Sequence, residues 1–255
     1  MGAERITVTS IETPYCSLER TNAPERRRAP NVVSVVTATN DTFRNSDLAQ
    51  EAAALGLPPQ AFAKQDDGAD LDFYAPPRLV THIDSEAVAA LTSHYGSVLK
   101  DGDRVLDLMS SWVSHLPANI ALDVVGHGMN AEELDANPRL DRWFVQDLNR
   151  NPVLPDGDAT FDTVLICVGV QYLQRPLAIF REMHRVLKTD GIAITSFSNR
   201  CFPSKAVAVW RSLDMSGQAG LIRLYFENAG FREPAIHVLA DGRSGDPLIV
   251  VEARA

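Results

Sequence analysis

RVLDLMSSW (104–112) opens an ordered series of segments that decides the fold of this chain. Each later segment again holds an apolar, strand-like run that stops abruptly at polar or small residues. They are DVVGHGMNAEEL (123–134), FVQDLN (144–149), FDTVLICVGVQYL (161–173) and REMHRVLKTDGIAITSFSN (181–199). In open α/β sheets, ligands bind just outside the carboxyl ends of the strands. We therefore expect a binding site where these runs stop.

Strands and helices alternate regularly through this region and beyond it. We expect strands at 104–108, 121–126, 143–146, 162–168, 192–198, 234–239 and 247–253. Helices are expected between most of them, including 204–214 and 217–229. Such alternation predicts a parallel sheet with right-handed crossovers. Only ADGRSGDP separates the last two strands, so these two should pair antiparallel.

Composition narrows the classes of function. The 255 residues are 45% hydrophobic, enough for a sizeable core, and the net charge of −9 argues against broad nucleic-acid binding, which needs a basic surface. The three cysteines form no CxxC pair, so we expect neither a disulfide framework nor a metal site. No apolar run is long enough to span a membrane, and the N-terminus lacks a secretory signal. We expect a cytoplasmic protein, monomeric or homodimeric, with no nucleic-acid or membrane partner.

The chain divides into three parts by composition. Residues 1–31 are charged, contain prolines and lack periodicity, which predicts a mobile N-terminal arm. Residues 32–72 contain a short helix at 46–57 and a connector, and we expect them to form a lid. Residues 73–255 are expected to form the main domain, whose first helix begins after the N-cap Asp84.

In this order and at this spacing, the series of segments resembles the class I S-adenosylmethionine (SAM)-dependent methyltransferases. It looks closest to the broad group that methylates metabolites (methyltransferase type 11, ubiquinone- and menaquinone-methyltransferase-like). The resemblance implies a Rossmann-like, doubly wound α/β fold with a seven-stranded sheet and a terminal antiparallel hairpin. It also implies SAM as the cofactor, S-adenosylhomocysteine (SAH) as the product, and methylation of a small molecule at sulfur, oxygen, nitrogen or carbon.

The first strand ends at Asp107, and the resemblance implies that this acid positions the amino group of SAM. The family then has a glycine-rich turn, which lets the backbone approach the ligand closely. Here the three glycines are replaced by Met109, Ser111 and Val113. We interpret the segment as a remodelled turn. In this interpretation, the hydroxyls of Ser110 and Ser111 replace backbone contacts, and Trp112 lies near the sulfonium or closes the pocket.

The second strand lacks the acid that binds the ribose hydroxyls in the family. Gly128 stands at that position, within VVGHGMN. We expect Asn130 to bind the ribose instead and Met129 to pack on the adenine. Asn130 and Glu133 also have the spacing of a capping box, so Asn130 should begin a helix.

The next two strands supply the remaining cofactor contacts that the resemblance implies. Asp147 matches the acid that accepts a hydrogen bond from the adenine amino group, and the backbone of Leu148 would meet a ring nitrogen. Val168 and Gln171 follow the fourth strand, where the family holds the methionine part of SAM. Tyr172 or Gln171 is a candidate to orient the nucleophile of the acceptor.

Two further segments carry candidate acceptor-binding residues. In FYAPPRLVTHID (73–84), we expect Tyr74 and Arg78 to contact the acceptor. His82 is the candidate general base, because imidazole titrates near neutral pH.

After the fifth strand, SFSNRCFPSK (196–205) places Asn199, Arg200 and Lys205 at the expected mouth of the site. Arg200 is a candidate to bind a carboxylate or carbonyl oxygen of the acceptor. Asn199 and Lys205 are expected to contact the substrate.

Alternatives stay open for both the acceptor and the function. A thiol acceptor is slightly favoured, because a thiolate is populated near neutral pH without a strong base. The missing glycines and the missing ribose acid also suit a non-catalytic binding or regulatory protein that has lost SAM. A nicotinamide-dependent reductase is disfavoured, because the chain lacks GxGxxG after the first strand and the acid that should follow it.

Overall fold

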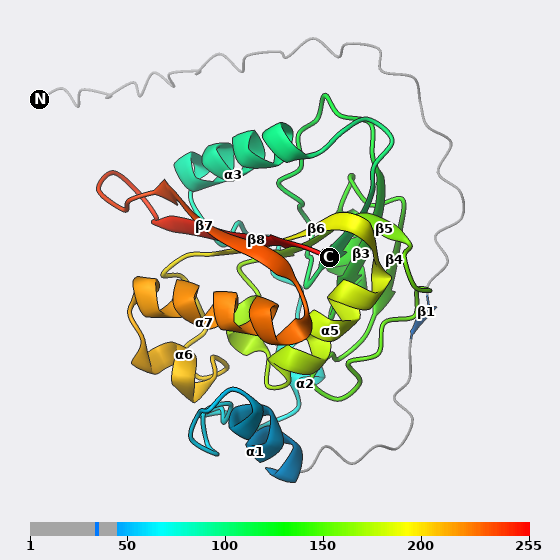
Figure 1. The fold of residues 1–255 in the computed structure, drawn as a ribbon. Helices are drawn as coiled ribbons and strands as arrows, with labels where there is room; N and C mark the ends of the chain where they lie inside the picture. Colours follow the sequence, from blue (N-terminus) through cyan, green and yellow to red (C-terminus); the bar gives the residue numbers. More distant parts are fainter. Residues whose placement is uncertain (1–33, 36–44) are drawn as a thin grey trace, which may run out of the picture.

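A computed structural model describes residues 34–35 and 45–255 of the chain (Figure 1). The N-terminal arm expected at 1–31 lies outside the described residues, as does most of the 32–44 stretch of the expected lid. No helix in the described ranges is both long and apolar enough to cross a membrane.

The described strands form one sheet in the order β1-β4-β3-β2-β5-β6-β8-β7. Their bounds are β1 Ser34–Val35, β2 Arg104–Leu108, β3 Asp123–Gly128, β4 Arg142–Val145, β5 Phe161–Cys167, β6 Leu187–Phe197, β7 Arg232–Ala240 and β8 Leu248–Arg254. The pairs from β1 to β6 are parallel, whereas β8 lies antiparallel to both β6 and β7. The predicted doubly wound sheet and its terminal antiparallel hairpin are therefore confirmed. The two-residue strand β1 adds an eighth strand beside β4.

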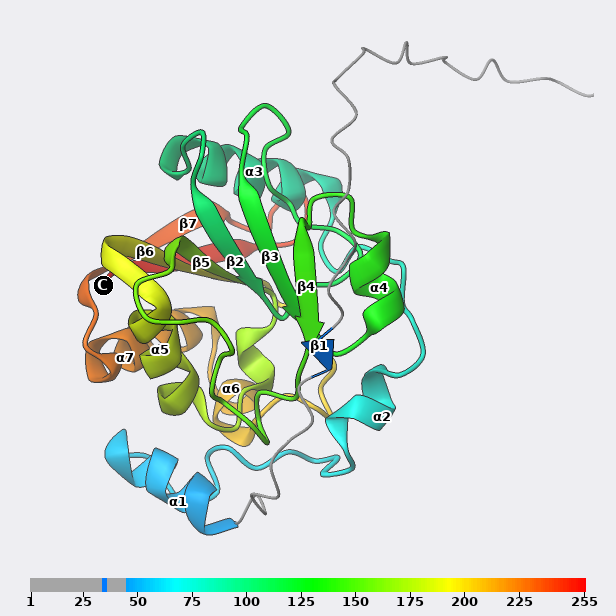
Figure 2. The ribbon, with the colours of Figure 1, turned by 90° about the vertical axis from the view of Figure 1, so that its right-hand side faces the viewer.

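Helices cover both faces of this sheet (Figures 1 and 2). They are α1 Asn45–Ala54, α2 Asp70–Tyr74, α3 Ser85–Val98, α4 Ala131–Ala136, α5 Pro176–Val186, α6 Ala208–Ser212 and α7 Met215–Ala229, with a 3-10 turn, η1, at Val170–Tyr172. On one face of the sheet, an apolar cluster includes residues of α3 and α4. On the opposite face, a second apolar cluster includes residues of α1, α5, α6 and α7. The parallel strands therefore lie between two layers of helices.

Two elements differ from the sequence-based expectation. The helix expected at 204–214 shrinks to α6, because the connector hydrogen-bonds to the loop before it, with Ser204 O accepting from Gln65 N at 3.2 Å. Strand β6 begins at Leu187 rather than at the expected residue 192, and its first residues include an irregularity with Asp190 at φ +62°.

The glycine-free turn after β2 is held in place by a buried histidine of β3. The Met109 N–H donates to Nδ1 of His127 at 3.1 Å, and the Ser110 N–H donates to the His127 carbonyl at 2.7 Å. The other ring nitrogen, Nε2, lies 2.8 Å from the Gln146 carbonyl and donates to it. The ring is therefore neutral, and burial lowers the pKa of His127 to about 4. One imidazole thus joins the turn to the segment after β4.

The turn has no glycine of its own, but two glycines lie directly beside it: Gly128 in β3 and Gly169 just after β5. Met109 adopts φ +57°, a left-handed conformation that is uncommon for a residue with a Cβ. A Cβ at Gly169 would lie 2.9 Å from the Met109 Cβ, and one at Gly128 would lie 2.6 Å from the Ser110 carbonyl oxygen. The close approach that the family makes with glycines in the turn is made here with glycines opposite it.

Gly128→Ala should destabilise the fold by about 1–3 kcal/mol, because the added methyl overlaps a backbone oxygen that cannot move freely. Gly96→Ala is the matched control: it lies in helix α3 with no atom near its Cβ, and should stabilise by about 0.5–1 kcal/mol. Urea unfolding of both variants measures the difference. Equal stability of Gly128→Ala and wild type would contradict the close packing of the turn.

Acid should weaken the fold through His127. Its folded-state pKa of about 4 lies below the ordinary imidazole value of 6.5, so its contribution to stability is complete above about pH 6.5 and is lost as the pH falls toward 4. Over that interval wild type should lose about 3 kcal/mol more unfolding free energy than His127→Gln. Denaturant titrations at several pH values test this. Parallel pH profiles for the two proteins would show that His127 does not stay neutral in the fold.

Candidate functional site

A cavity of about 1090 Å³, measured to its open mouth, lies at the carboxyl ends of β2, β3 and β5 and beside the segment after β4. We call it the central cavity. Eleven of the predicted site residues line it: Tyr74, Arg78, His82, Ser110, Ser111, Met129, Asn130, Leu148, Val168, Tyr172 and Arg200.

Asp107 lies in a smaller cavity of about 550 Å³ that adjoins the central one. Met109, Ser110 and Cys167 line both cavities. The Asp107 carboxylate accepts hydrogen bonds from Ser110 Oγ at 2.7 Å and from Ser114 Oγ at 2.6 Å. Burial raises the pKa of this carboxyl despite the two hydroxyl donors. A buried carboxylate beside the central cavity is suited to bind a cationic group.

Glu133, in the first turn of α4, brings a carboxylate to the end of β3 where Gly128 leaves none. It lines the central cavity, and its two oxygens accept from Ser111 Oγ at 2.5 Å and from the Arg78 N–H at 2.6 Å. The sequence analysis treated Glu133 only as part of a capping box. Its position five residues after the acid-free strand end was the signal that could have identified it.

Asn130 is committed to structural hydrogen bonds. Its Oδ1 accepts from the Glu133 N–H at 3.0 Å and so begins α4, as predicted. Its amide nitrogen donates to the carbonyls of Tyr74 at 3.0 Å and Ala75 at 2.9 Å. The side chain therefore ties the segment before α3 to the end of β3, and leaves little capacity for the expected ribose contact.

Aromatic rings form one wall of the cavity. Tyr74, Tyr172 and Phe202 line it, and Phe73 packs edge-on against Tyr74 and Phe202; the centroids of the contacting rings lie 4.9–6.5 Å apart. The Tyr172 hydroxyl accepts from the Phe202 N–H at 2.9 Å. Burial raises the pKa of Tyr172 to about 12 and raises that of Tyr74 further. Both phenols therefore stay protonated near neutral pH and are poor general bases.

His82 lies at the same wall, with its ring 6.1 Å from that of Phe202. His82 is exposed overall, yet desolvation on its cavity side lowers its pKa, against the opposing effect of Glu133. The imidazole is therefore neutral at pH 7 and able to accept a proton. The two thiols in the cavity are less suited to that role. Burial raises the pKa of Cys167 to about 12 and also raises that of Cys201.

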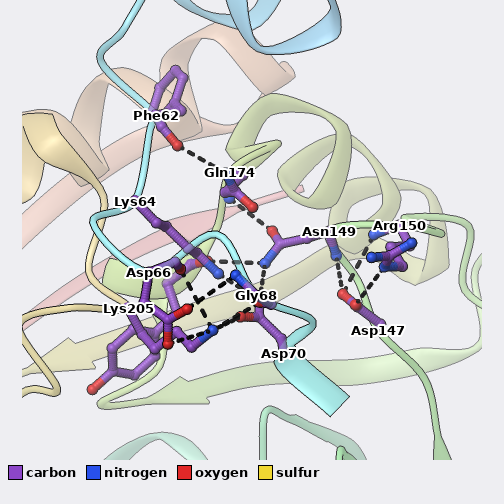
Figure 3. A network of polar contacts seen from close by, with 11 residues as sticks. Phe62, Lys64, Asp66, Gly68, Asp70, Asp147, Asn149, Arg150, Gln174 and Lys205 are labelled. Carbon is purple, nitrogen blue, oxygen red and sulfur yellow. Dashed lines mark hydrogen bonds and ion pairs between the residues drawn. The ribbon is translucent and has the colours of Figure 1, made fainter. Parts of the chain in front are cut away.

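Other predicted residues lie outside the central cavity. Lys205 is buried, and its Nζ donates to the Gly68 carbonyl at 2.8 Å and pairs with Asp66 and Asp70 (Figure 3). Lys64 also pairs with Asp70, at 2.5 Å. This network fixes the connector to the main domain. The surroundings of Lys205 therefore indicate a structural role and not the predicted substrate contact.

Asp147 faces a third cavity, beside this network. Its carboxylate accepts from the N–H groups of Asn149 at 2.9 Å and Arg150 at 3.4 Å, and burial raises its pKa. Asn149 itself lines the central cavity and donates to Asp70 and to the Tyr172 carbonyl, both at 3.0 Å. Asp147 thus shapes the turn that presents Leu148 and Asn149 to the cavity.

Four predicted residues have other surroundings. The Trp112 indole donates to the Val80 carbonyl at 3.0 Å and does not line the cavity. Gln171 is buried and donates to the Val168 carbonyl at 2.9 Å. Asn199 is exposed, with a 3.3 Å contact from Ser198 Oγ. Arg200 reaches the mouth of the cavity but is exposed and pairs with Asp246 at 2.8 Å.

Comparison with known proteins finds one matching family model and several similar solved structures. The family model described as "Methyltransferase domain" matches residues 111–195. No curated protein matches the chain in sequence.

Three solved structures show the same fold at low identity. The chain is similar to one from the complex between the Trm112 methyltransferase activator and a methyltransferase of Haloferax volcanii (17% identity, TM-score 0.51, 67% of this chain and 90% of that one). It is similar to a SAM-dependent methyltransferase of Thermotoga maritima (15%, 0.50, 66% and 89%) and to the 4+2 cyclase SpnF (14%, 0.51, 87% and 98%). The chain therefore has the class I SAM-dependent methyltransferase fold, and its residues 111–195 match the methyltransferase domain family.

Proposed function

We propose that this protein binds SAM in the central cavity and transfers its methyl group to a small-molecule acceptor. One observation carries the proposal: the cavity stays open at the carboxyl ends of β2, β3 and β5 although the turn after β2 has no glycine. Gly128 and Gly169 give the turn the room that its own residues do not. Neither Met109 nor Trp112 closes the volume.

The side chains around the cavity fit the three parts of SAM. Asp107, with its two serine donors, suits the cationic amino group. Glu133 suits the ribose hydroxyls, because each of its oxygens has a second lone pair beyond the bond it already accepts. Leu148 and Asn149 line the cavity after β4, and the resemblance implies that this segment contacts the adenine. These assignments give Glu133 the role first expected of Asn130.

SAM, when bound, supplies an electrophilic methyl group on a sulfonium. The protein's own part is to exclude water and to handle the acceptor's proton. The rings of Tyr74, Tyr172 and Phe202 keep one side of the cavity apolar. His82 is positioned to take a proton from a hydroxyl or thiol acceptor. A thiol remains slightly favoured, since it ionises near neutral pH with the least help.

A second candidate function also has support. The fold neighbour SpnF is a 4+2 cyclase, so a cavity of this fold need not transfer methyl groups. A protein that binds the donor without transferring its methyl group, or that binds another ligand altogether, would show the same cavity.

Titration calorimetry with SAH should detect binding to wild type, and Asp107→Asn should weaken it by about tenfold or more, because a charge-assisted hydrogen bond is lost. Asp241→Asn, on the exposed β7–β8 loop, is the matched control and should bind SAH like wild type. Misfolding is not expected to explain a loss. Burial raises the folded pKa of Asp107, so its contribution to stability is present below about pH 4 and is lost as the pH rises. Asp107→Asn should therefore be at least as stable as wild type at pH 7.

Turnover separates the two candidate functions. SAM is incubated with panels of thiols, phenols, amines and carboxylates, and SAH release is measured. SAH formation that depends on one acceptor class supports methyl transfer and names the atom. Binding of SAH without turnover on any class favours the non-catalytic alternative, and the absence of SAH binding contradicts the proposal.

A further inference from the structure

The guanidinium of Arg78 lies in the aromatic wall of the central cavity. Its Cζ is 4.7 Å from the ring centroid of Phe73, 5.5 Å from that of Phe202 and 5.8 Å from that of Tyr74. These distances are those of cation–π contacts. The rings of Phe73, Tyr74 and Phe202 therefore already surround a cation, which is the protein's own Arg78.

The hydrogen-bonding capacity of this guanidinium is only partly used. Nη2 donates to the Phe73 carbonyl at 2.9 Å, whereas Nη1 is buried and has no hydrogen-bond partner. Arg78 makes no ion pair with any residue in the described ranges; the backbone N–H, not the guanidinium, bonds to Glu133. A buried charged donor without a partner is costly, and a bound anion would remove that cost.

We propose that the methyl acceptor carries a carboxylate on an aromatic or apolar body, and that Arg78 selects it by binding this carboxylate rather than the atom that is methylated; this rests on the proposed function. A carboxylate accepts two parallel bonds from a guanidinium, and the rings of Tyr74, Tyr172 and Phe202 cover an apolar body. An ammonium group is disfavoured, because the rings that would hold it already face Arg78. Arg200, the residue first expected to bind a carboxylate, is exposed and neutralised by Asp246.

The position of Arg78 points to the acceptor rather than to the carboxylate of SAM itself. The rings around it come from the segment before α3 and from the loop after β6, not from the ends of β2 or β3. The amino-acid end of SAM is assigned to Asp107, at the end of β2. The two charged groups thus serve different ligands in one cavity.

The test measures binding of matched carboxylate and amide pairs to the protein saturated with SAH. The probes are benzoate and benzamide, phenylacetate and phenylacetamide, and 3-phenylpropanoate and its amide. In wild type, at least one carboxylate should bind about tenfold more tightly than its amide. Arg78→Gln should abolish that preference, and Arg78→Lys, which keeps the charge but not the fork, should retain part of it. Arg223→Gln, on the exposed face of α7, is the matched control and should keep the full preference.

The SAH affinity of each variant tells the failures apart. If wild type does not bind SAH, the proposed function fails before Arg78 is tested. If SAH binds but no pair shows a preference for the carboxylate, or if Arg78→Gln keeps the preference, the anionic acceptor is wrong. If Arg78→Gln loses SAH affinity instead, the residue holds the carboxylate of the donor, and this proposal is overturned.

Discussion

The site depends on one buried, neutral imidazole. His127 receives the Met109 N–H on one ring nitrogen and donates to the Gln146 carbonyl with the other, so it joins three strand ends with two hydrogen bonds. A turn rich in glycine follows the first strand of related folds because the backbone there must take conformations that side chains disfavour. Here Met109 takes such a conformation, and the surrounding bonds must hold it. Without that bridge, nothing in the sequence of the turn would keep it open.

The packing of this turn also explains why the ribose acid is missing. The Ser110 carbonyl occupies the space that any side chain at position 128 would need, so only glycine fits there. The carboxylate then has to come from elsewhere, and Glu133 reaches the same end of β3 from the first turn of α4. The absence of glycines in the turn after β2 and the absence of an acid at position 128 are therefore linked by the same backbone packing. Residues that look like signs of a decayed site are consistent with a site rebuilt around a different backbone path.

Local patterns in the sequence predicted the fold well and the site only in part. The strand at 104–108, the parallel pairing of the earlier strands and the terminal antiparallel hairpin follow from apolar periodicity and loop length, which are local properties. Lys205, Trp112 and Asn130 were read as ligand contacts because they follow strands. Their actual partners lie 32 to 139 residues away in the chain: Gly68 and Asp66 for Lys205, Val80 for Trp112, and Tyr74 for Asn130. The N-terminal segment folds back onto the main domain and uses the hydrogen-bonding groups that a ligand would otherwise have used. A local sequence pattern does not predict such a distant contact.

This N-terminal segment runs from Lys64 to Val80, and its two halves are held to the main domain by different interactions. Its first half is fastened by Lys64, Asp70 and Lys205, whose side chains are 1–7% exposed (Figure 3). Separating a buried ion pair costs about 3–5 kcal/mol, so an open form of this half would be populated at under about 1%. The second half, from Tyr74 to Val80, accepts two hydrogen bonds from Asn130 and one from Trp112, and donates one to Glu133. Because Glu133 contacts both this half and the cavity, we expect a ligand that binds this carboxylate to change how firmly the second half is held.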